Sequence, residues 1–325
     1  MSTLSSTSTS DQVADFFGGP RCAGKTVLIT GGNTGIGQDT VRVLASKGAT
    51  VIFTSRSKSN GDAALAKLQE QCPGAQISYM SVDLSSLQSV KVFAEEFTQK
   101  YRELHILINN AGVMACPKSF TTDGFENQFG VNHIGHFYLT QLLLPLLKRT
   151  ATAKEPARII NLSSVANIMA PAEGIQFDDL NADKSYYRWG RYGQSKFANV
   201  LFSKELQRRY ATDNIVSVAV HPGVIKATDL WRYTDMWTNV TFMYYILTHR
   251  HMAPMPNEHL AEKTIPQGSA TTVVAAMSPS LVPGGYYADC QETSAGLHKL
   301  ANDEALAKKL WEYSEKAISE RVAKF

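Results

Sequence analysis

The amino-acid sequence predicts a single doubly wound α/β domain, in which helices cover both faces of a mostly parallel central sheet. Short apolar runs alternate with helix-patterned stretches along most of the 325 residues. That alternation is typical of right-handed strand–helix–strand units. The apolar runs are continuous rather than alternating, so both of their faces must be covered, as they are in a parallel sheet.

Six strands are expected, each a short run of apolar residues: 27–29, 51–53, 77–82, 106–108, 158–162 and 215–220. The apolar spacing between them predicts helices at residues 35–47, 62–71, 87–101, 125–148 and 192–210. A last helical pattern covers residues 303–322. There is no internal repeat and no low-complexity linker. We therefore expect one domain over residues 21–325, preceded by a flexible Ser/Thr-rich tail at residues 1–20.

Composition argues against several classes of protein. Hydrophobic residues make up 44% of the chain and charged residues 19%, as in a globular protein with a core. The net charge is +3 and no Lys/Arg cluster is present, which argues against nucleic-acid binding. The four cysteines form no CxxC pair, which indicates free thiols in a reducing compartment. We see no signal peptide and no membrane span, and expect a cytoplasmic protein.

A glycine-rich turn, TGGNTGIG at residues 30–37, follows the first strand directly and opens the first helix. Gly31 would permit the sharp turn, Gly35 would let the backbone approach a pyrophosphate, and Gly37 would allow close helix–strand packing. Many tight turns are glycine-rich, but the strand–turn–helix context favours dinucleotide binding. The residues expected at the phosphates are Gly31, Asn33, Thr34, Gly35, Ile36 and Gly37.

Arg56 stands at the end of the second strand, where a dinucleotide site meets the adenosine ribose. A carboxylate at this place would accept a hydrogen bond from the ribose 2′-OH and repel a 2′-phosphate, whereas arginine does the reverse. Arg56 therefore predicts NADP(H) as the cofactor. The alternative is a solvated arginine that merely follows a strand.

Tyr192 and Lys196 lie one helical turn apart and share one helix face. A free phenol has a pKa of about 10, and a nearby ammonium, joined by an oxidised nicotinamide, would lower that pKa. Because this spacing also occurs by chance on exposed helix faces, the interpretation depends on a third group. Ser164 follows the fifth strand, and its hydroxyl could hold a substrate oxygen beside the phenol. Ser163 fits a cap or turn better.

With the glycine turn, the strand-end serine and the Tyr/Lys pair in this order, residues 25–230 resemble the short-chain dehydrogenase/reductase family, which has the Rossmann fold. Further similar motifs are NNAG at residues 109–112, Asp83–Leu84, Asn132, and HPGV at residues 221–224. The resemblance adds Asp83, Leu84, Asn110, Ala111, Gly112, Tyr192, Lys196, Pro222, Gly223 and Val224 to the expected cofactor contacts.

The resemblance also implies catalytic roles. Tyr192 would give or take the proton, and Lys196 would bind the nicotinamide ribose and lower the pKa of Tyr192. Ser164 would orient the substrate oxygen, and Asn132 would hold a water that links Lys196 to solvent. After Pro222 and Gly223 the family places a threonine on the nicotinamide carboxamide. Ala227 occupies the usual spacing here, so that contact is assigned to Thr228.

Three segments are similar to the retinol dehydrogenase and WW-domain oxidoreductase branch: FDDLN at residues 177–181, YRW at 187–189 and YGQSKFAN at 192–199. The resemblance implies an NADP(H)-dependent alcohol dehydrogenase or carbonyl reductase. Its substrate would be a lipophilic aldehyde or ketone, such as a retinoid, a steroid or a specialised metabolite, and the chain would form a homo-oligomer. The alternative is a non-catalytic NADP(H)-binding sensor or scaffold, which would not need all four catalytic residues.

Two features leave alternatives open. The expected substrate loop, at about residues 225–266, contains an aromatic-rich stretch at residues 231–247. This stretch could be a lid over the substrate, a peripheral contact with a membrane, or packing against the sheet edge or a subunit. His133 and His136 could be two metal ligands on one helical turn, but no third ligand has suitable spacing. We therefore expect no metal.

Overall fold

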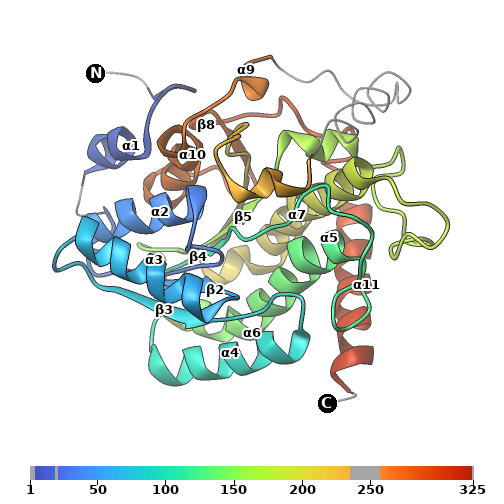
Figure 1. Cartoon of the computed structure of the whole chain (residues 1–325), viewed down its shortest axis with the longest axis horizontal. Helices are drawn as coiled ribbons and strands as arrows, with labels where there is room; N and C mark the ends of the chain where they lie inside the picture. Colours follow the sequence, from blue (N-terminus) through green and yellow to red (C-terminus); the bar gives the residue numbers. More distant parts are fainter. Residues whose placement is uncertain (1–3, 19–20, 235–256, 324–325) are drawn as a thin grey trace.

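The protein, described by a computed structural model over residues 4–18, 21–234 and 257–323, is built around an eight-stranded sheet with the order β3-β2-β1-β4-β5-β6-β7-β8. The strands are β1 (Thr26–Ile29), β2 (Thr50–Ser55), β3 (Ile77–Ser81), β4 (Ile106–Asn109), β5 (Ala157–Leu162), β6 (Ile215–Val220), β7 (Tyr286–Ala288) and β8 (Gln291–Glu292). The pairs from β3 to β7 are parallel, and β8 is antiparallel to β7. The predicted fold class is confirmed (Figure 1).

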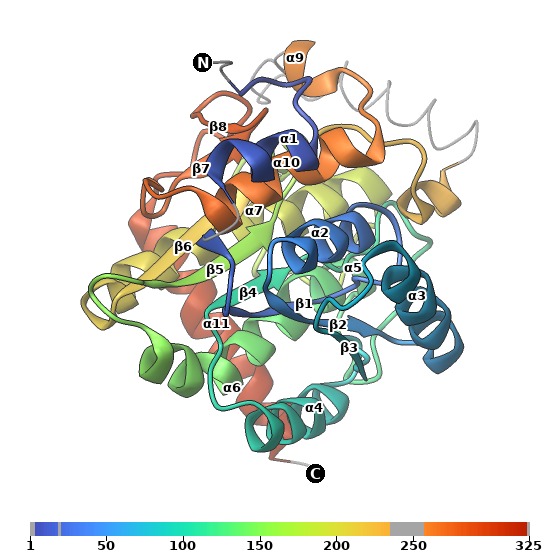
Figure 2. The ribbon, with the colours of Figure 1, turned by 90° about the vertical axis from the view of Figure 1, so that its left-hand side faces the viewer.

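Helices cover both faces of the sheet. One face packs against α2 (Gly35–Ser46), α3 (Lys58–Gln71) and α10 (Ile265–Met277), with α1 (Ser10–Phe17) packed on α2 and α10. The other face packs against α4 (Leu87–Lys100), α6 (Gly135–Thr150) and α7 (Arg188–Tyr210), with α11 (Glu304–Val322) packed on α7 and α4. Figure 2 shows α1, α2 and α10 on one side of the sheet and α4 and α6 on the other. Alternate residues of β1 therefore enter different cores, Leu28 on one side and Val27 and Ile29 on the other. No helix within the described ranges has both the length and the apolar character needed to cross a membrane.

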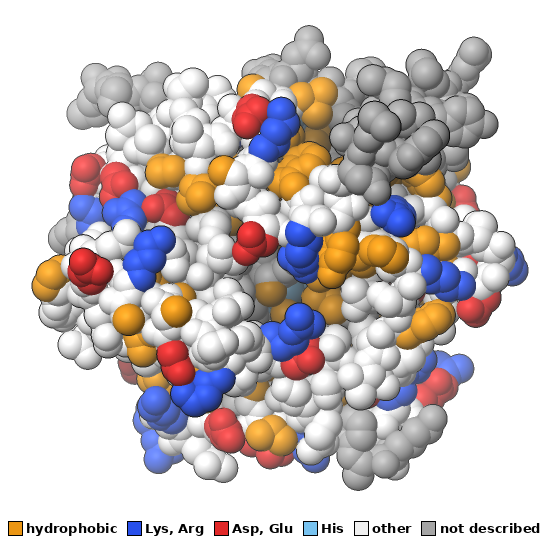
Figure 3. Space-filling model, in the orientation of Figure 1, with side chains coloured by type: hydrophobic (Ala, Val, Ile, Leu, Met, Phe, Trp, Pro, Cys, Tyr) orange, Lys and Arg blue, Asp and Glu red, His pale blue; other side chains and the backbone are white. Residues whose placement is uncertain are grey.

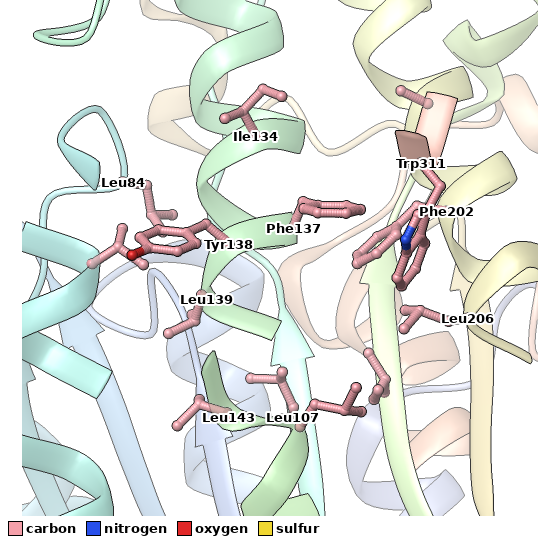
Figure 4. Packing of buried hydrophobic residues seen from close by; sticks show 14 of the residues in the cluster. Leu84, Leu107, Ile134, Phe137, Tyr138, Leu139, Leu143, Phe202, Leu206 and Trp311 are labelled. Carbon is pink, nitrogen blue, oxygen red and sulfur yellow. The ribbon is translucent and has the colours of Figure 1, made fainter. Parts of the chain in front are cut away.

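The core under α11 holds the two helices that carry the site. Trp311 of α11 lies 4.9 Å from the ring of Phe137 on α6 and 5.9 Å from that of Phe202 on α7 (Figure 4). All three rings are almost completely buried. Burying one such side chain contributes about 1.5–3 kcal/mol. The C-terminal helix therefore fixes α6 and α7 against each other.

The expected flexible tail at residues 1–20 is partly wrong. Within it, Ser10–Phe17 forms helix α1, which begins with a capping box between Thr9 and Gln12. Val13 and Ala14 are completely buried in the core shared with α2 and α10. Arg42 of α2 forms an ion pair with Asp11 at 2.7 Å. The amphipathic pattern SDQVADFF is short, and only its tertiary partners make it a helix.

The helix expected over residues 125–148 is divided into three parts. The short α5 (Asn127–Phe129) leads into a π-helical turn at Gly130–Ile134, and α6 follows. Such turns widen a helix locally and are frequent at functional sites. Asn132 lies within this turn. The apolar spacing did not reveal the turn because a single wide turn hardly changes the helical period.

Candidate active site

A cavity of about 720 Å³ lies at the carboxyl ends of the parallel strands. Its lining comes from the segments that follow β1 to β6, on both sides of the point where the strand order reverses between β1 and β4. Open α/β sheets bind ligands at this switch point. Figure 3 shows the face of the molecule hollowed near its middle, with hydrophobic and basic side chains at the border.

The glycine turn forms a tight cradle at one end of this cavity. Gly31 and Gly35 have left-handed backbone angles, with φ of +66° and +56°. A Cβ on Gly37 would lie 2.3 Å from the carbonyl oxygen of Gly31, so no other residue fits without movement. Helix α2 begins at this turn with no side-chain hydrogen bond from its N-cap, Thr34. The first N–H groups of α2 are therefore available to an anion.

Thr30 joins the glycine turn to the loop after β4, a role that the sequence analysis did not assign. Its hydroxyl oxygen accepts hydrogen bonds from the backbone N–H groups of Asn110 at 2.9 Å and Ala111 at 3.0 Å. The side-chain amide of Asn110 donates to the carbonyl oxygen of Thr30 at 2.8 Å. The same hydroxyl lies 2.8 Å from Nε2 of His136. Two walls of the cavity are thus held together by one threonine.

His133 and His136, the two possible metal ligands, each have their own hydrogen-bonding partners. His136 contacts Thr30 through Nε2, and its Nδ1 lies 3.0 Å from the backbone oxygen of Asn132. Nε2 of His133 lies 2.9 Å from the hydroxyl of Ser314 on α11. Burial lowers the pKa of His136 to about 4 and that of His133 to about 3, so both rings are neutral near pH 7.

The predicted adenosine contacts line the opposite end of the cavity from Tyr192. Arg56 is exposed there, next to Ser55 and Ser57, and Asp83 and Leu84 lie beside it on the segment after β3. The carboxylate of Asp83 accepts hydrogen bonds from the backbone N–H of Ser85 at 2.9 Å and from its hydroxyl at 2.7 Å. These bonds fix the loop after β3. Within the described part of the chain, no hydrogen bond or ion pair holds the exposed guanidinium of Arg56 at the mouth of the cavity.

The predicted proton-transfer residues meet at the other end. Lys196 Nζ lies 5.7 Å from the centre of the Tyr192 ring, and both residues are at least 96% buried. The Nζ atom donates to the carbonyl oxygen of Leu162 at 3.0 Å, at the end of β5. Ser164 follows two residues later and is half-buried, and its hydroxyl is close enough to Tyr192 to lower the pKa of the phenol. The hydroxyl of Ser163 instead donates to the carbonyl oxygen of Lys196 at 2.8 Å, as a structural contact.

Burial is the main influence on the pKa values of Tyr192 and Lys196. It lowers the pKa of Lys196 from 10.5 to about 8 and raises the pKa of Tyr192 well above its ordinary value of 10. The Ser164 hydroxyl opposes the increase for Tyr192. The pKa of Tyr192 is therefore raised rather than lowered as expected, because the low-polarity surroundings disfavour the charged forms of both residues.

Asn132 fixes the loop after β4 next to Lys196. Its amide nitrogen donates to the carbonyl oxygen of Val113 at 2.9 Å and to the Ser195 hydroxyl at 2.9 Å. Its amide oxygen accepts from the backbone N–H of Val113 at 2.8 Å. A Cβ on Gly112 would lie 3.2 Å from that oxygen and 3.5 Å from Lys196 Nζ. The NNAG loop thus packs directly on two of the four expected catalytic residues.

The loop after β6 completes the cavity. Pro222, Gly223, Val224 and Thr228 all line it, whereas Ala227 is exposed outside. The Thr228 methyl group would lie 3.0 Å from a Cβ on Gly35, so this side chain reaches across to the glycine turn. The geometry therefore places Thr228, rather than Ala227, at the cavity.

An apolar compartment adjoins Tyr192. Trp231 lies 6.3 Å from Trp189, which lies 6.4 Å from the Tyr192 ring. Further apolar lining comes from Met114, Val165, Ala166, Met169 and Leu230. Of the aromatic stretch at residues 231–247, positions 235–247 lie outside the described residues, as do positions 235–256 of the expected substrate loop.

Comparisons with known proteins agree with this geometry. A family model described as short chain dehydrogenase matches residues 25–178. The chain is 40% identical to retinol dehydrogenase 12 of Homo sapiens, over 93% of this chain and 90% of that protein. It is 41% identical to short-chain dehydrogenase TIC 32 A, chloroplastic, of Brassica napus, over 90% and 88% of the two chains.

Solved structures give the same picture. A putative uncharacterized protein from Mycobacterium paratuberculosis is 33% identical, with a TM-score of 0.69 over 91% of this chain and 94% of that chain. The NADP active-site complex of RhlG from Pseudomonas aeruginosa is 26% identical, with a TM-score of 0.61 over 81% and 94%.

Proposed function

The chain belongs to the short-chain dehydrogenase/reductase family and is similar to its retinol dehydrogenases; from this premise we propose that it is an NADP(H)-dependent oxidoreductase acting on a lipophilic carbonyl or alcohol. The observation that carries the proposal is one continuous cavity, with the glycine turn and Arg56 at one end and Ser164, Tyr192 and Lys196 at the other. A dinucleotide would fit such a cavity, with its adenosine half at the Arg56 end and its nicotinamide half at the Tyr192 end.

The residues present fit such a cofactor. The cradle at Gly31, Gly35 and Gly37 admits no side chain without movement, and the first N–H groups of α2 open onto it. Pyrophosphate binds at helix N-termini of this kind. Arg56 would hold the 2′-phosphate through charge-assisted hydrogen bonds, which supports NADP(H) over NAD(H). When bound, the nicotinamide supplies or accepts the hydride.

The chain's own residues handle the proton. In the reducing direction the hydroxyls of Ser164 and Tyr192 hold the substrate carbonyl oxygen, and the Tyr192 phenol donates a proton to it. The Lys196 ammonium stabilises the phenolate that remains. Since Tyr192 and Lys196 are almost completely buried, water competes little for these positions, and their electrostatic interactions are strong. Oxidation of an alcohol uses the same groups in reverse.

The apolar compartment supports a lipophilic substrate. Trp189, Trp231 and Met169 face it together with other uncharged side chains. Apolar linings of this kind bind ligands by removing their hydrophobic surface from water. Retinoids, steroids and specialised metabolites with a carbonyl group all have such surface, and the compartment alone does not select among them.

The proposal is tested by mixing purified protein and NADPH with a panel of lipophilic and small aldehydes and ketones, all-trans-retinal among them. We expect NADPH oxidation with lipophilic members, slower oxidation of NADH, and strongly reduced turnover by Tyr192→Phe. Binding of NADPH without turnover of any member would instead indicate a sensor or scaffold. Absence of dinucleotide binding would refute the proposal altogether.

Homo-oligomerisation and a cytoplasmic location also remain proposals. Both come from the family resemblance and from the sequence, and the Brassica relative is described as chloroplastic. Light scattering of the purified chain measures the first, and imaging of a tagged chain in its own cells tests the second.

A further inference from the structure

The loop formed by Pro222, Gly223 and Val224, called here the 222–224 loop, lines the Tyr192 end of the cavity and is braced from behind by distant residues. We propose that Lys263 and Asp289 form a buried ion pair that positions this loop for the nicotinamide end of the cofactor. The proposal rests on the proposed function. Neither residue lines the cavity, so both are positioning residues rather than catalytic ones.

Backbone and side-chain contacts join Lys263 to the loop. Val224 pairs with Glu262 in a parallel β-bridge, and the backbone N–H of Lys263 donates to the carbonyl oxygen of Val224 at 2.8 Å. Gly223 has a left-handed φ of +93°, and a Cβ there would lie 2.6 Å from Cδ of Lys263. The lysine stem is thus packed directly on the loop, and moving the stem moves the loop.

The ammonium group of Lys263 is held by a carboxylate that follows strand β7. Its side chain is 3% exposed, and its Nζ contacts Oδ1 of Asp289, whose side chain is 15% exposed. Asp289 directly follows β7 and has a left-handed φ of +50°. A buried ammonium strongly requires a counter-charge. The ion pair therefore ties the position of Lys263 to the end of β7.

His221 extends the same assembly toward the catalytic serine. Its Nδ1 accepts hydrogen bonds from the backbone N–H groups of Val165 at 3.1 Å and Gly223 at 3.4 Å. Its Nε2 therefore carries the proton and donates to the backbone oxygen of His259 at 3.2 Å. His259 in turn places its Nε2 3.5 Å from Oδ2 of Asp289. The Asp289 carboxylate thus contacts two side chains that support the loop, those of His259 and Lys263.

The adenosine end of the cavity is built differently. The glycine turn and the NNAG loop are held by Thr30, and Arg56 lies at the end of β2, across the sheet from β7. Loss of the ion pair should therefore weaken contacts with the nicotinamide half of the cofactor and leave the adenosine half unchanged. If the ion pair only stabilised the fold, its loss would weaken binding of both halves of the cofactor equally.

The test uses Asp289→Asn and Lys263→Met in the full chain. Asparagine tolerates the left-handed backbone of residue 289, and methionine keeps an unbranched stem against Gly223. Calorimetric titration measures the Kd of NADPH and of 2′,5′-ADP, which lacks the nicotinamide half. We expect the Kd of NADPH to rise about tenfold or more, because small misplacements of a site are costly, with the Kd of 2′,5′-ADP unchanged. The matched control is Lys308→Met, which breaks an exposed ion pair with Glu312 on α11, away from the cavity.

Hydrogen–deuterium exchange of the cofactor-free protein provides an independent readout. We expect faster exchange at the amides of Gly223 and Lys263 in both variants. If neither single variant folds, the double variant K263M/D289N takes their place, because no unpaired charge remains in it. Unchanged exchange at these amides would overturn the proposal that the Lys263–Asp289 ion pair positions the loop. Equally weakened binding of NADPH and of 2′,5′-ADP would overturn it as well. If the wild type binds no dinucleotide, the proposed function fails. The exchange measurement then still tests whether Lys263 and Asp289 position the 222–224 loop.

Discussion

Replacing Lys196 by methionine should make the cofactor-free protein more stable while abolishing its activity. Lys196 is almost completely buried, and burial lowers the pKa of its ammonium from 10.5 to about 8. The folded state therefore binds this proton less tightly than the unfolded state does. Methionine has a similar length and carries no charge. The carbonyl oxygen of Leu162, which accepts from Lys196, keeps a hydrogen bond from Asn199 at 3.0 Å.

The size of the effect follows from the pKa difference. Each tenfold change in proton affinity corresponds to about 1.4 kcal/mol, so burial of the charged lysine costs about 3 kcal/mol at pH 7. Between pH 8 and 10.5 the unfolded chain binds more protons than the folded chain. The free energy of unfolding of the wild type therefore rises with pH between pH 8 and 10.5 as the Lys196 penalty is lost. The advantage of Lys196→Met should accordingly fall to about 2 kcal/mol at pH 9.

Urea denaturation at pH 7 and at pH 9, followed by circular dichroism, measures both quantities. The control is the exposed Lys299→Met, for which the free energy of unfolding should change by less than about 0.5 kcal/mol. NADPH oxidation with the best carbonyl substrate should be lost in Lys196→Met, since the phenolate of Tyr192 loses its counter-charge. A Lys196→Met protein that is less stable than wild type at pH 7 would refute the argument from burial.

Three further changes test the site. Tyr192→Phe keeps the ring and its contact with Trp189, so NADPH affinity by fluorescence titration should stay while turnover falls about 10²–10⁴-fold; retained turnover would contradict the proton-transfer role. Arg56→Asp should shift cofactor preference toward NADH, with a rise of about 10- to 100-fold in the Kd of NADPH; an unchanged ratio of the two affinities would exclude a 2′-phosphate contact. Gly37→Ala places a methyl group 2.3 Å from the Gly31 oxygen, so thermal unfolding should show a loss of about 1–3 kcal/mol, with weaker NADPH binding; wild-type behaviour would show that the cradle relaxes freely.

The motifs that sequence analysis recognised are local ones. The glycine turn depends on residues 30–37, and the Tyr192/Lys196 pair depends on one helical turn. Glycines are needed there by backbone geometry, and helical spacing alone places the pair on one face. The parallel strands were predicted for a similar reason, because continuous apolar runs reflect burial on both faces.

Features held by distant contacts had only weak local signals. The three-residue β7 is too short for a hydrophobic period, and α1 exists because Val13 and Ala14 pack on α2 and α10. Most of the predicted site residues line one cavity, with Asn132 completely buried behind it, but this convergence requires the ends of six strands to meet. That arrangement depends on strand order, which no single segment encodes.

The sequence by itself determined the fold class and the glycine cradle, because each depends on periodicity or on backbone freedom over a few residues. Its resemblance to a family supplied most of the other expected site residues. Only the tertiary structure decided that His136 connects Thr30 to Asn132, and that Lys263 and Asp289 brace the 222–224 loop. The contacts of His136 with Thr30 and of Lys263 with Asp289 join residues far apart in the chain. Their strength comes from burial, which is a property of the folded whole.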